Sequence, residues 1–141
     1  MISNITTWFN KIINKKEDER FYYLSLIKKD KIFSIHGLWP QTNKEHYPTY
    51  CKKIDFSIEA LKPIINDLNR FWHSNTEKNK LFWEHEYKKH GSCMFTPLTE
   101  FQYFNKVLLL YFKAIVQKQP EKYYKNSKCL IPVDLNFQFI S

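Results

Sequence analysis

The sequence predicts an α+β fold in which an antiparallel sheet packs against several helices. Three segments with strand patterning lie toward the two ends of the chain, at residues 21–27, 32–35 and 131–139. Three segments with helical patterning lie between them, at residues 58–72, 81–90 and 101–116. The length of 141 residues suits one domain around one core, and the 18% share of aromatic residues predicts a core of large rings.

The strand segments follow from composition and alternation. Residues 21–27 are rich in strand-forming side chains, residues 28–31 break the pattern and residues 32–35 resume it, which predicts two strands joined by a tight turn. The second strand is expected to end in the segment 36–40, because this segment contains a glycine and a proline. Apolar residues alternate from 131 to 139, which predicts a strand that pairs with those at the start of the chain.

The helical segments repeat apolar residues every three or four positions. Residues 58–72 predict a helix in which Pro63 lies near the first turn or causes a kink. Residues 81–90 predict a second helix that is closed by Gly91 at the usual C-terminal position. Residues 101–116 predict a third, strongly apolar helix.

The composition indicates a basic protein without a membrane segment. Lys and Arg number 22 against 14 Asp and Glu, and a net charge of +8 favours a polyanion such as nucleic acid, although a merely soluble basic protein has the same charge. The longest apolar run, residues 107–112, is far too short to span a bilayer, so no membrane partner is expected. We interpret residues 1–141 as one domain in which residues 1–20 form an atypical helical N-terminal segment without a secretion-signal pattern.

The chain has two glycines, Gly37 and Gly91, and each directly follows a histidine. A sequence this poor in glycine keeps it where the backbone needs an unusual angle or a close approach. The surrounding segments are FSIHGLWP at 33–40 and FWEHEYKKHGSC at 82–93. We therefore expect the chemistry to lie in these two segments.

The second segment places an acid and bases on one helix face. Glu86, Lys89 and His90 stand at positions i, i+3 and i+4, and His85 borders them at about 100° around the helix. An ordinary solvated helix with a Glu–Lys pair has the same spacing. A zinc site of the His-Glu-x-x-His type is not expected, because His85 and His90 are five residues apart, about 140° around a helix.

Two histidines with a lysine and a carboxylate suit the cleavage of RNA. RNA carries its own nucleophile, the 2′-hydroxyl group. Two imidazoles with ordinary pKa values near 6.5 can serve as general base and general acid, and a cation beside the phosphate stabilises the developing charge. Neither a metal nor another cofactor is required.

The two segments resemble those of the ribonuclease T2 family of acid, largely base-nonspecific ribonucleases, which includes the S-ribonucleases of plants. The family carries segments of the kind His-Gly-Leu-Trp-Pro and Phe-Trp-x-His-Glu-x-x-Lys-His-Gly-x-Cys, and both are present here, in order. Weaker likeness extends over roughly residues 21–140, through Tyr47, Trp72 and Tyr103. The resemblance implies a ribonuclease T2-like fold and a monomeric endoribonuclease that cleaves single-stranded RNA through a 2′,3′-cyclic phosphate.

The resemblance also implies roles for the catalytic residues. His36 would protonate the leaving 5′-oxygen, and His90 would be the general base on the 2′-hydroxyl. His85 would bind phosphate, and Glu86 and Lys89 would polarise it and stabilise the pentacovalent state.

Aromatic residues of the motifs receive separate interpretations. The resemblance implies that Trp39 stacks on one base and that Phe82 lines a second base site, although core packing is the alternative for Trp39. We assign Trp83 to the core. His46 and His73 lie outside the motifs and are expected on the surface or in loops, although His46 and its neighbour Tyr47 could still border the base pocket.

The three cysteines cannot all pair, so the residues alone allow one disulfide with one free thiol or three free thiols. The resemblance implies a disulfide between Cys51 and Cys93 and gives no partner for Cys129. It also implies a secreted or endolysosomal location.

The chain departs from the family at two places. A Gln-Trp-Pro segment and a cysteine pair are absent before residue 36, where the chain turns back at once through residues 28–31, and the C-terminal cysteine-bearing strands are absent. These departures leave base preference open. They also motivate an alternative function, a catalytically weak or inactive RNA-binding or decoy protein on the same fold.

Overall fold

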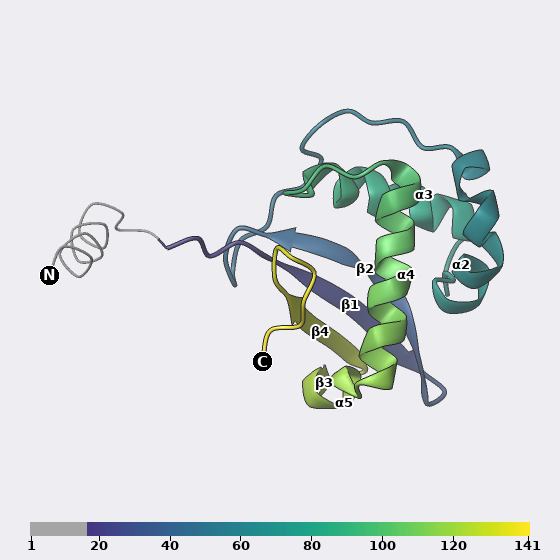
Figure 1. Cartoon of the computed structure of the whole chain (residues 1–141). Coiled ribbons are helices and arrows are strands. Elements are labelled where there is room, and N and C mark those ends of the chain that lie inside the picture. The colour runs from purple at the N-terminus through teal and green to yellow at the C-terminus, as the bar shows by residue number, and fades with distance from the viewer. Residues whose placement is uncertain (1–16) are drawn as a thin grey trace, which may run out of the picture.

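The computed structural model describes residues 17–141 and has the predicted α+β architecture (Figure 1). The N-terminal helix expected within residues 1–20 lies mostly outside the described residues, and residues 17–20 have no regular secondary structure. In chain order the elements are β1 (Phe21–Lys29), β2 (Ile32–Gln41), the 3₁₀ helix η1 (Ile58–Ile64), α2 (Ile65–Phe71), α3 (Asn79–Lys89), the 3₁₀ turn η2 (Gly91–Cys93), α4 (Glu100–Val116), α5 (Gln119–Tyr123), β3 (Tyr124–Lys125) and β4 (Lys128–Val133).

Four antiparallel strands form one sheet in the order β2-β1-β4-β3. The pairing of β1 with β4 confirms that strands from the two ends of the chain lie side by side. Asp30 and Lys31 make the tight turn of the β1–β2 hairpin, and both have positive φ, as a two-residue hairpin turn requires.

The expected end of the second strand in the segment 36–40 is wrong, because β2 continues to Gln41. Gly37 has no positive φ, and β2 is an outer strand, where a proline removes no ladder hydrogen bond on the solvent side. The register slips within β2, since Ser25 faces Gly37 whereas Leu26 faces Ile35. His36 is therefore the extra residue of a β-bulge, a device that redirects a side chain.

The C-terminal strand is also shorter than predicted, because β4 ends at Val133. The Asp134 carboxylate accepts hydrogen bonds from the backbone N–H groups of Asn136 and Gln138, at 2.8 and 2.9 Å, and turns the chain back. An isolated bridge between Val133 and Phe139 follows the turn. The apolar alternation past residue 133 thus serves packing against the core.

The three helical segments between the strands are present as predicted, but the first of them is divided into two helices. Residues 58–72 split into η1 and α2, and Pro63 lies inside the 3₁₀ part, where its missing N–H and its ring oppose a regular α-helix. Helix α3 ends at Lys89, and Gly91 begins a 3₁₀ turn in place of a left-handed cap. Helix α4 begins with a capping box between Thr99 and Gln102. Within residues 17–141, no helix is long and apolar enough to cross a membrane.

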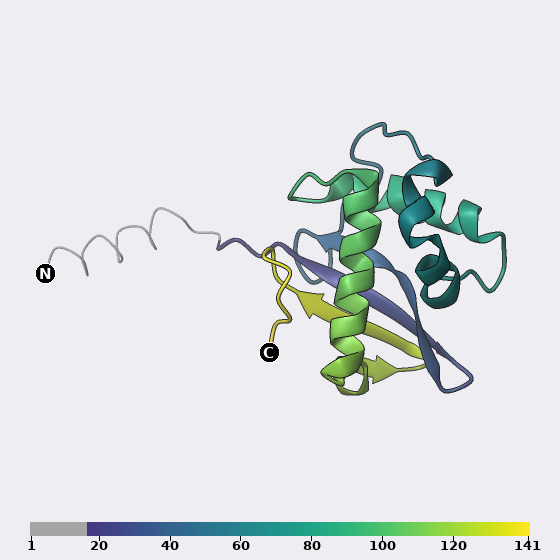
Figure 2. The same ribbon diagram turned by 45° about the vertical axis from the view of Figure 1, so that its right-hand side comes forward.

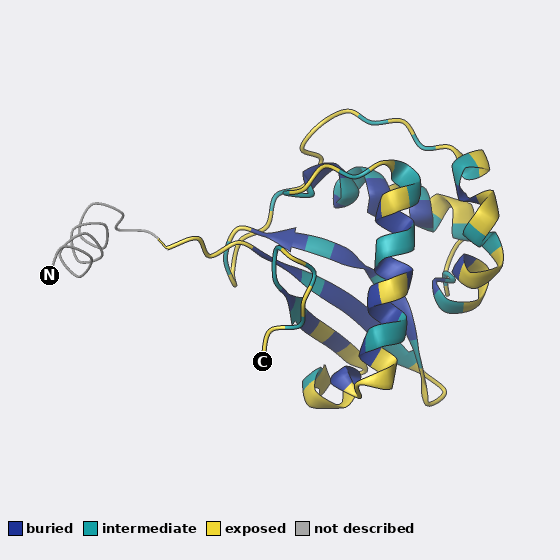
Figure 3. Ribbon diagram, in the orientation of Figure 1, coloured by how far each residue is buried: buried dark blue, intermediate teal, exposed yellow. Residues whose placement is uncertain are grey.

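Helix α4 crosses one face of the sheet, as the two views in Figures 1 and 2 show. Alternate residues of the strands point toward this helix and are buried, as are those along its inner side (Figure 3). The largest fully buried side chains are aromatic and come mainly from the helices: Trp72, Trp83, Tyr22, Tyr103 and Phe104. The prediction that Trp83 packs in the core is confirmed.

Side chains of the helices hold the outer strand β2 in place. The hydroxyls of Tyr103 and Tyr111 donate hydrogen bonds to the backbone carbonyls of Leu38 and Phe33, at 3.0 and 2.7 Å. The indole N–H of Trp72 donates to the carbonyl of His36 at 3.1 Å. These contacts satisfy carbonyls that an edge strand would otherwise leave unpaired.

Candidate active site

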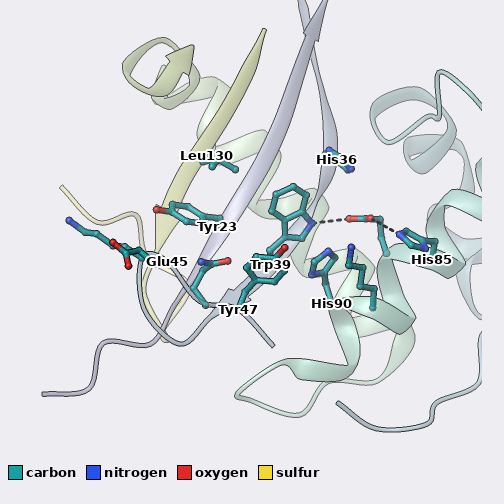
Figure 4. Close-up of a pocket in the computed structure, with 12 residues that line it drawn as sticks. Tyr23, His36, Trp39, Glu45, Tyr47, His85, His90 and Leu130 are labelled. Atoms are coloured by element: carbon teal, nitrogen blue, oxygen red, sulfur yellow. Dashed lines mark hydrogen bonds and ion pairs between the residues drawn. The ribbon is translucent and has the colours of Figure 1, made fainter. Parts of the chain in front are cut away.

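The two His-Gly segments meet in one cavity between the sheet and α3 (Figure 4). It contains all five residues predicted to be catalytic, together with Trp39, and its lining is completed from β1, β4 and the loop after β2. The lining residues are Tyr23, His36, Trp39, Gln41, Lys44, Glu45, Tyr47, His85, Glu86, Lys89, His90 and Leu130.

The bulge in β2 places His36 in the cavity with an aromatic ring on each of two sides. Its imidazole lies edge-on to Trp39 at 5.0 Å between centroids and tilted against Phe82 at 5.6 Å. Burial, followed by the positive charges of Lys128, His85 and Lys89, lowers the pKa of His36 to about 4. In the free protein at neutral pH, His36 is therefore uncharged.

His90 lies at the C-terminal end of α3 and is only 5% exposed. Its imidazole stacks on the indole of Trp39, with centroids 5.1 Å apart and planes 27° apart. Burial lowers the pKa of His90 to about 3, with contributions from the charges of Lys89, His36 and His85. Its Nδ1 atom is buried and has no hydrogen-bond partner among the described residues.

Glu86 is a buried carboxyl group held between two site residues. Its Oε1 atom accepts a hydrogen bond of 2.9 Å from the indole N–H of Trp39, and its Oε2 atom lies 4.0 Å from Nε2 of His85. Burial raises the pKa of Glu86 to about 7, although the bond from Trp39 and the charge of Lys89 favour ionisation. This carboxyl group therefore changes charge near neutral pH.

Both glycines are required for close approach, and neither has the unusual backbone angle that was the other expectation. A Cβ atom on Gly37 would clash with the Glu86 carboxylate and would lie only 2.7 Å from Trp39 Nε1. A Cβ atom on Gly91 would meet the ring of Tyr87 at 2.6 Å. The first glycine thus admits the Trp39–Glu86 hydrogen bond against the strand.

The disulfide between Cys51 and Cys93 is present and ties the loop after β2 to the end of α3. The backbone N–H of Tyr50 donates to the Lys89 carbonyl at 2.9 Å, and that of Cys51 donates to the Ser92 hydroxyl at 3.0 Å. The loop that carries Tyr47 is therefore fastened beside Lys89 and His90. Cys129 is a buried free thiol, and burial raises its pKa to about 11.

The remaining predictions differ in outcome. Trp39 is half-buried at the cavity rather than in the core, and Phe82 contacts His36 from outside the set of lining residues. Tyr47 borders the cavity. His46, in contrast, is exposed and bonded to Asn43, and His73 stays in a loop, so both lie outside the site as expected.

The sequence interpretation missed several lining residues from outside the motifs: Tyr23, Gln41, Lys44, Glu45 and Leu130. Tyr23 and Leu130 reach the site only because β1 lies between β2 and β4. The strand register was the signal that could have revealed them, since Tyr23 pairs with Trp39. The sequence predicted that the two ends of the chain pair, but the register of β4 against β1, which brings Leu130 to the site, is not readable from local patterns.

The arrangement combines two uncharged, desolvated imidazoles with an ammonium group and a buried carboxyl group. Such groups can transfer protons to and from a substrate and stabilise negative charge that develops on it. Within the described part of the chain, no group of three or more His, Cys, Asp or Glu side chains is placed to hold a metal ion.

Known proteins are similar to this chain in sequence and in fold. Ribonuclease DdI of Dictyostelium discoideum is 36% identical over 113 residues, which are 77% of this chain and 51% of that protein. A ribonuclease-like storage protein of Panax ginseng is 33% identical over 78 residues, 54% of this chain and 33% of that protein. The chain thus spans about half, or less, of the length of these relatives.

The solved structure of RNase NT in complex with 5′-AMP has the same fold, with a TM-score of 0.68 at 20% identity over 89% of this chain and 90% of that one. The family model described as the ribonuclease T2 family matches residues 3–127. Most of the chain, including both His-Gly segments, lies in this match. The chain therefore belongs to the ribonuclease T2 family.

Proposed function

We propose that this chain is an endoribonuclease that cleaves single-stranded RNA by metal-independent transesterification. The observation that carries the proposal is that His36 and His90, 54 positions apart in the sequence, line one cavity with Lys89 and Glu86. Each imidazole lies about 5 Å from the indole of Trp39, at 5.0 and 5.1 Å between centroids, so Trp39 contacts both rings at the wall of the cavity that would hold the scissile phosphodiester.

The two imidazoles take opposite roles in one step. His90 accepts the proton of the 2′-hydroxyl as its oxygen attacks phosphorus, and His36 donates a proton to the 5′-oxygen as the P–O5′ bond breaks. The products are a 2′,3′-cyclic phosphate and a 5′-hydroxyl. The lowered pKa of His90 keeps it free to accept a proton, while the phosphate charge favours protonation of His36 once RNA binds.

Lys89, His85 and Glu86 are proposed to act on the phosphate. The Lys89 ammonium lies in the cavity and can neutralise charge that builds on the non-bridging oxygens. Below pH 7 the Glu86 carboxyl group is mostly protonated, because burial raises its pKa, and it can donate a hydrogen bond to the same oxygens. All of these groups come from one chain, so a monomer is sufficient.

Aromatic rings around the histidines are proposed to hold the bases. Trp39 lines the cavity against both imidazoles. Tyr47 lies beside His90, and Phe82 lies against His36. Stacking on such rings is worth about 1–3 kcal/mol per base and tolerates any base. Trp39 also fixes Glu86 and contacts both imidazoles, so its replacement is expected to lower both binding and turnover.

The test is cleavage of single-stranded RNA in the presence of EDTA. We expect wild type to give cyclic-phosphate and 5′-hydroxyl ends, and His36→Ala and His90→Ala each to lower kcat by about 10²–10⁴-fold. His46→Ala is the matched control, because this exposed histidine lies outside the cavity. Intact RNA across pH 4–8, or equal cutting of DNA, would contradict the proposal.

The pH dependence of kcat/KM is a second test. Because the pKa of His36 is about 4 in the free protein, the protonated acid becomes about tenfold rarer for each pH unit above it. We expect kcat/KM to fall from about pH 4 to pH 7. A maximum above pH 7 would show that His36 is not the general acid.

The alternative is an RNA-binding protein that keeps the fold without turnover. A relative named as a ribonuclease-like storage protein, and the missing Gln-Trp-Pro segment, motivate it. It predicts salt-dependent RNA binding with no cleavage and with no change in His90→Ala. The complete catalytic set in one cavity favours the enzyme.

A further inference from the structure

The sheet has a second face, opposite α4, and the catalytic cavity occupies only one end of it. Strand residues that alternate with those facing α4 point to this face, and the strand register arranges them in rows. These rows are Trp39–Tyr23–Pro132, then Gly37–Ser25–Leu130, then Ser34–Ile27–Lys128. The first two rows contribute Trp39, Tyr23 and Leu130 to the cavity, and the third continues the same surface beyond it.

Lysines stand at the end of this surface. Lys128 follows Leu130 on the same side of β4, because Cys129 between them is buried. Lys125 of β3 pairs with Lys128, so their side chains lie on the same face, and both residues are exposed. Successive residues on one face of a strand are about 7 Å apart, so Lys128 lies one step beyond the cavity wall.

This surface suits a polyanion with apolar parts. The strand residues on it are aromatic, aliphatic, small or basic, and among residues 17–141 no strand position on this face is acidic. Leu130 is 42% exposed and Ile27 is half-buried, which leaves an apolar floor between the cavity and the lysines. Nucleic acid has this pattern, with sugars and bases between phosphates.

The row of Lys128 lies on the His36 side of the site. Ser34 precedes the bulge at His36, whereas the row of Trp39 lies past it, toward the loop that carries Tyr47 against His90. The charge of Lys128 acts on the pKa of His36, second only to burial, and is absent from the groups that shift His90. By the strand register, Lys128 therefore lies on the side of the site that holds the group serving the leaving oxygen.

We propose that Lys128, with Lys125 beside it, binds a backbone phosphate of RNA on the 3′ side of the scissile bond. The inference rests on the proposed function, in which His36 protonates the leaving 5′-oxygen, an atom that belongs to the 3′ nucleotide. RNA that extends past His36 then runs over Leu130 and Ile27 toward these lysines. The site accordingly favours longer chains over dinucleotides.

The test uses DNA oligonucleotides that contain one cleavable ribonucleotide, so each has a single cutting site. The substrates are rU-dT, rU-dT₄ with a 3′ extension, and dT₄-rU-dT with a 5′ extension. For each enzyme, kcat/KM of an extended substrate is divided by kcat/KM of rU-dT, which cancels any effect on the chemical step. We expect Lys128→Gln to lower the 3′-extension ratio about threefold to fivefold at low salt and to leave the 5′-extension ratio unchanged.

Lys113→Gln is the matched control, because it removes the same charge from α4, on the opposite side of the sheet. The salt dependence of kcat/KM for rU-dT₄ should become shallower by about 0.7 in a log–log plot for Lys128→Gln and stay constant for Lys113→Gln. An unchanged 3′ ratio, or a loss confined to the 5′ ratio, would overturn the proposal. Failure of wild type to cleave any of these substrates, or RNA, would instead overturn the proposed function.

Discussion

The two faces of the sheet use the same strands for opposite purposes. Toward α4, alternate residues such as Leu24, Leu26 and Ile131 are fully buried among aromatic rings and carry no charge. On the other face, His36 and the Glu86 side chain that α3 brings to the cavity are removed from water, and burial disfavours their charged forms. Burial stabilises the fold on the first face and sets proton affinities on the second, so substitutions on the two faces should separate stability from activity.

The largest effect is expected from the α4 face. Phe104 is fully buried and packs against Trp72, with ring centroids 4.9 Å apart. Phe104→Ala should lower the free energy of unfolding by about 3–5 kcal/mol, measured by urea denaturation, because it removes apolar contacts and leaves a cavity. At a temperature where the variant is folded, kcat should stay near that of wild type; a loss beyond tenfold would show that the two faces are coupled.

The disulfide links the active-site loop to α3, and its removal tests whether this link serves stability or chemistry. Cys51→Ser with Cys93→Ser opens a loop with a sequence separation of 42 residues and should cost about 3–4 kcal/mol of unfolding free energy in the chain-entropy model. Cys129→Ala is the control, since this free thiol closes no loop. Equal stability of the double variant and wild type would contradict the expected role.

Gly37 and Gly91 allow the same substitution, glycine to alanine, to be compared beside the cavity and beside the core. Gly37→Ala displaces the tip of the Glu86 side chain and breaks its bond with Trp39, so kcat/KM should fall about a hundredfold, with a loss of unfolding free energy below about 2 kcal/mol. Gly91→Ala instead pushes on the ring of Tyr87, which packs in the core. Gly91→Ala should therefore lose more unfolding free energy than Gly37→Ala and less kcat/KM. The opposite result for the two variants would contradict these assignments.

The smallest effect is a change in how stability depends on pH. The pKa of Glu86 is raised from 4.5 to about 7 on folding, so its stabilising contribution is complete below pH 4.5 and is lost as pH rises through 7. Glu86→Gln lacks this loss. Its Tm relative to wild type should therefore be higher at pH 8 than at pH 5, while its activity falls, and a difference independent of pH would indicate an altered fold.

His36 and His90 make stability depend on pH in the opposite direction to Glu86. Their pKa values are lowered to about 4 and about 3, so the unfolded chain takes up protons below its ordinary pKa near 6.5 while the folded chain does not. Wild-type stability should fall as pH drops from 6.5 through 4. His90→Ala should reduce this acid loss, as measured by urea denaturation at pH 4 and pH 7.

Local patterns predicted the helices and strands in which apolar residues repeat over several helical turns or several strand positions. Helix α4 begins one residue before its predicted start, and β1 extends two residues past its predicted end. The predictions were wrong where a local signal had a tertiary cause. Gly37 and Pro40 suggested a strand end, but pairing with β1 carries β2 to Gln41. The alternation from 131 to 139 suggested one strand, but Asp134 turns the chain back.

The sequence by itself determined the family, the fold class and the candidate catalytic residues, because two long motifs and their helix spacing are written in consecutive residues. Only the tertiary structure decided how these groups behave. The burial that lowers the pKa of His36 and His90 and raises that of Glu86, and the register that brings Tyr23, Leu130 and Lys128 beside them, arise from segments far apart in the chain. Proton affinity depends on the surroundings of a group, and those surroundings exist only once the strands have paired and the helices have packed.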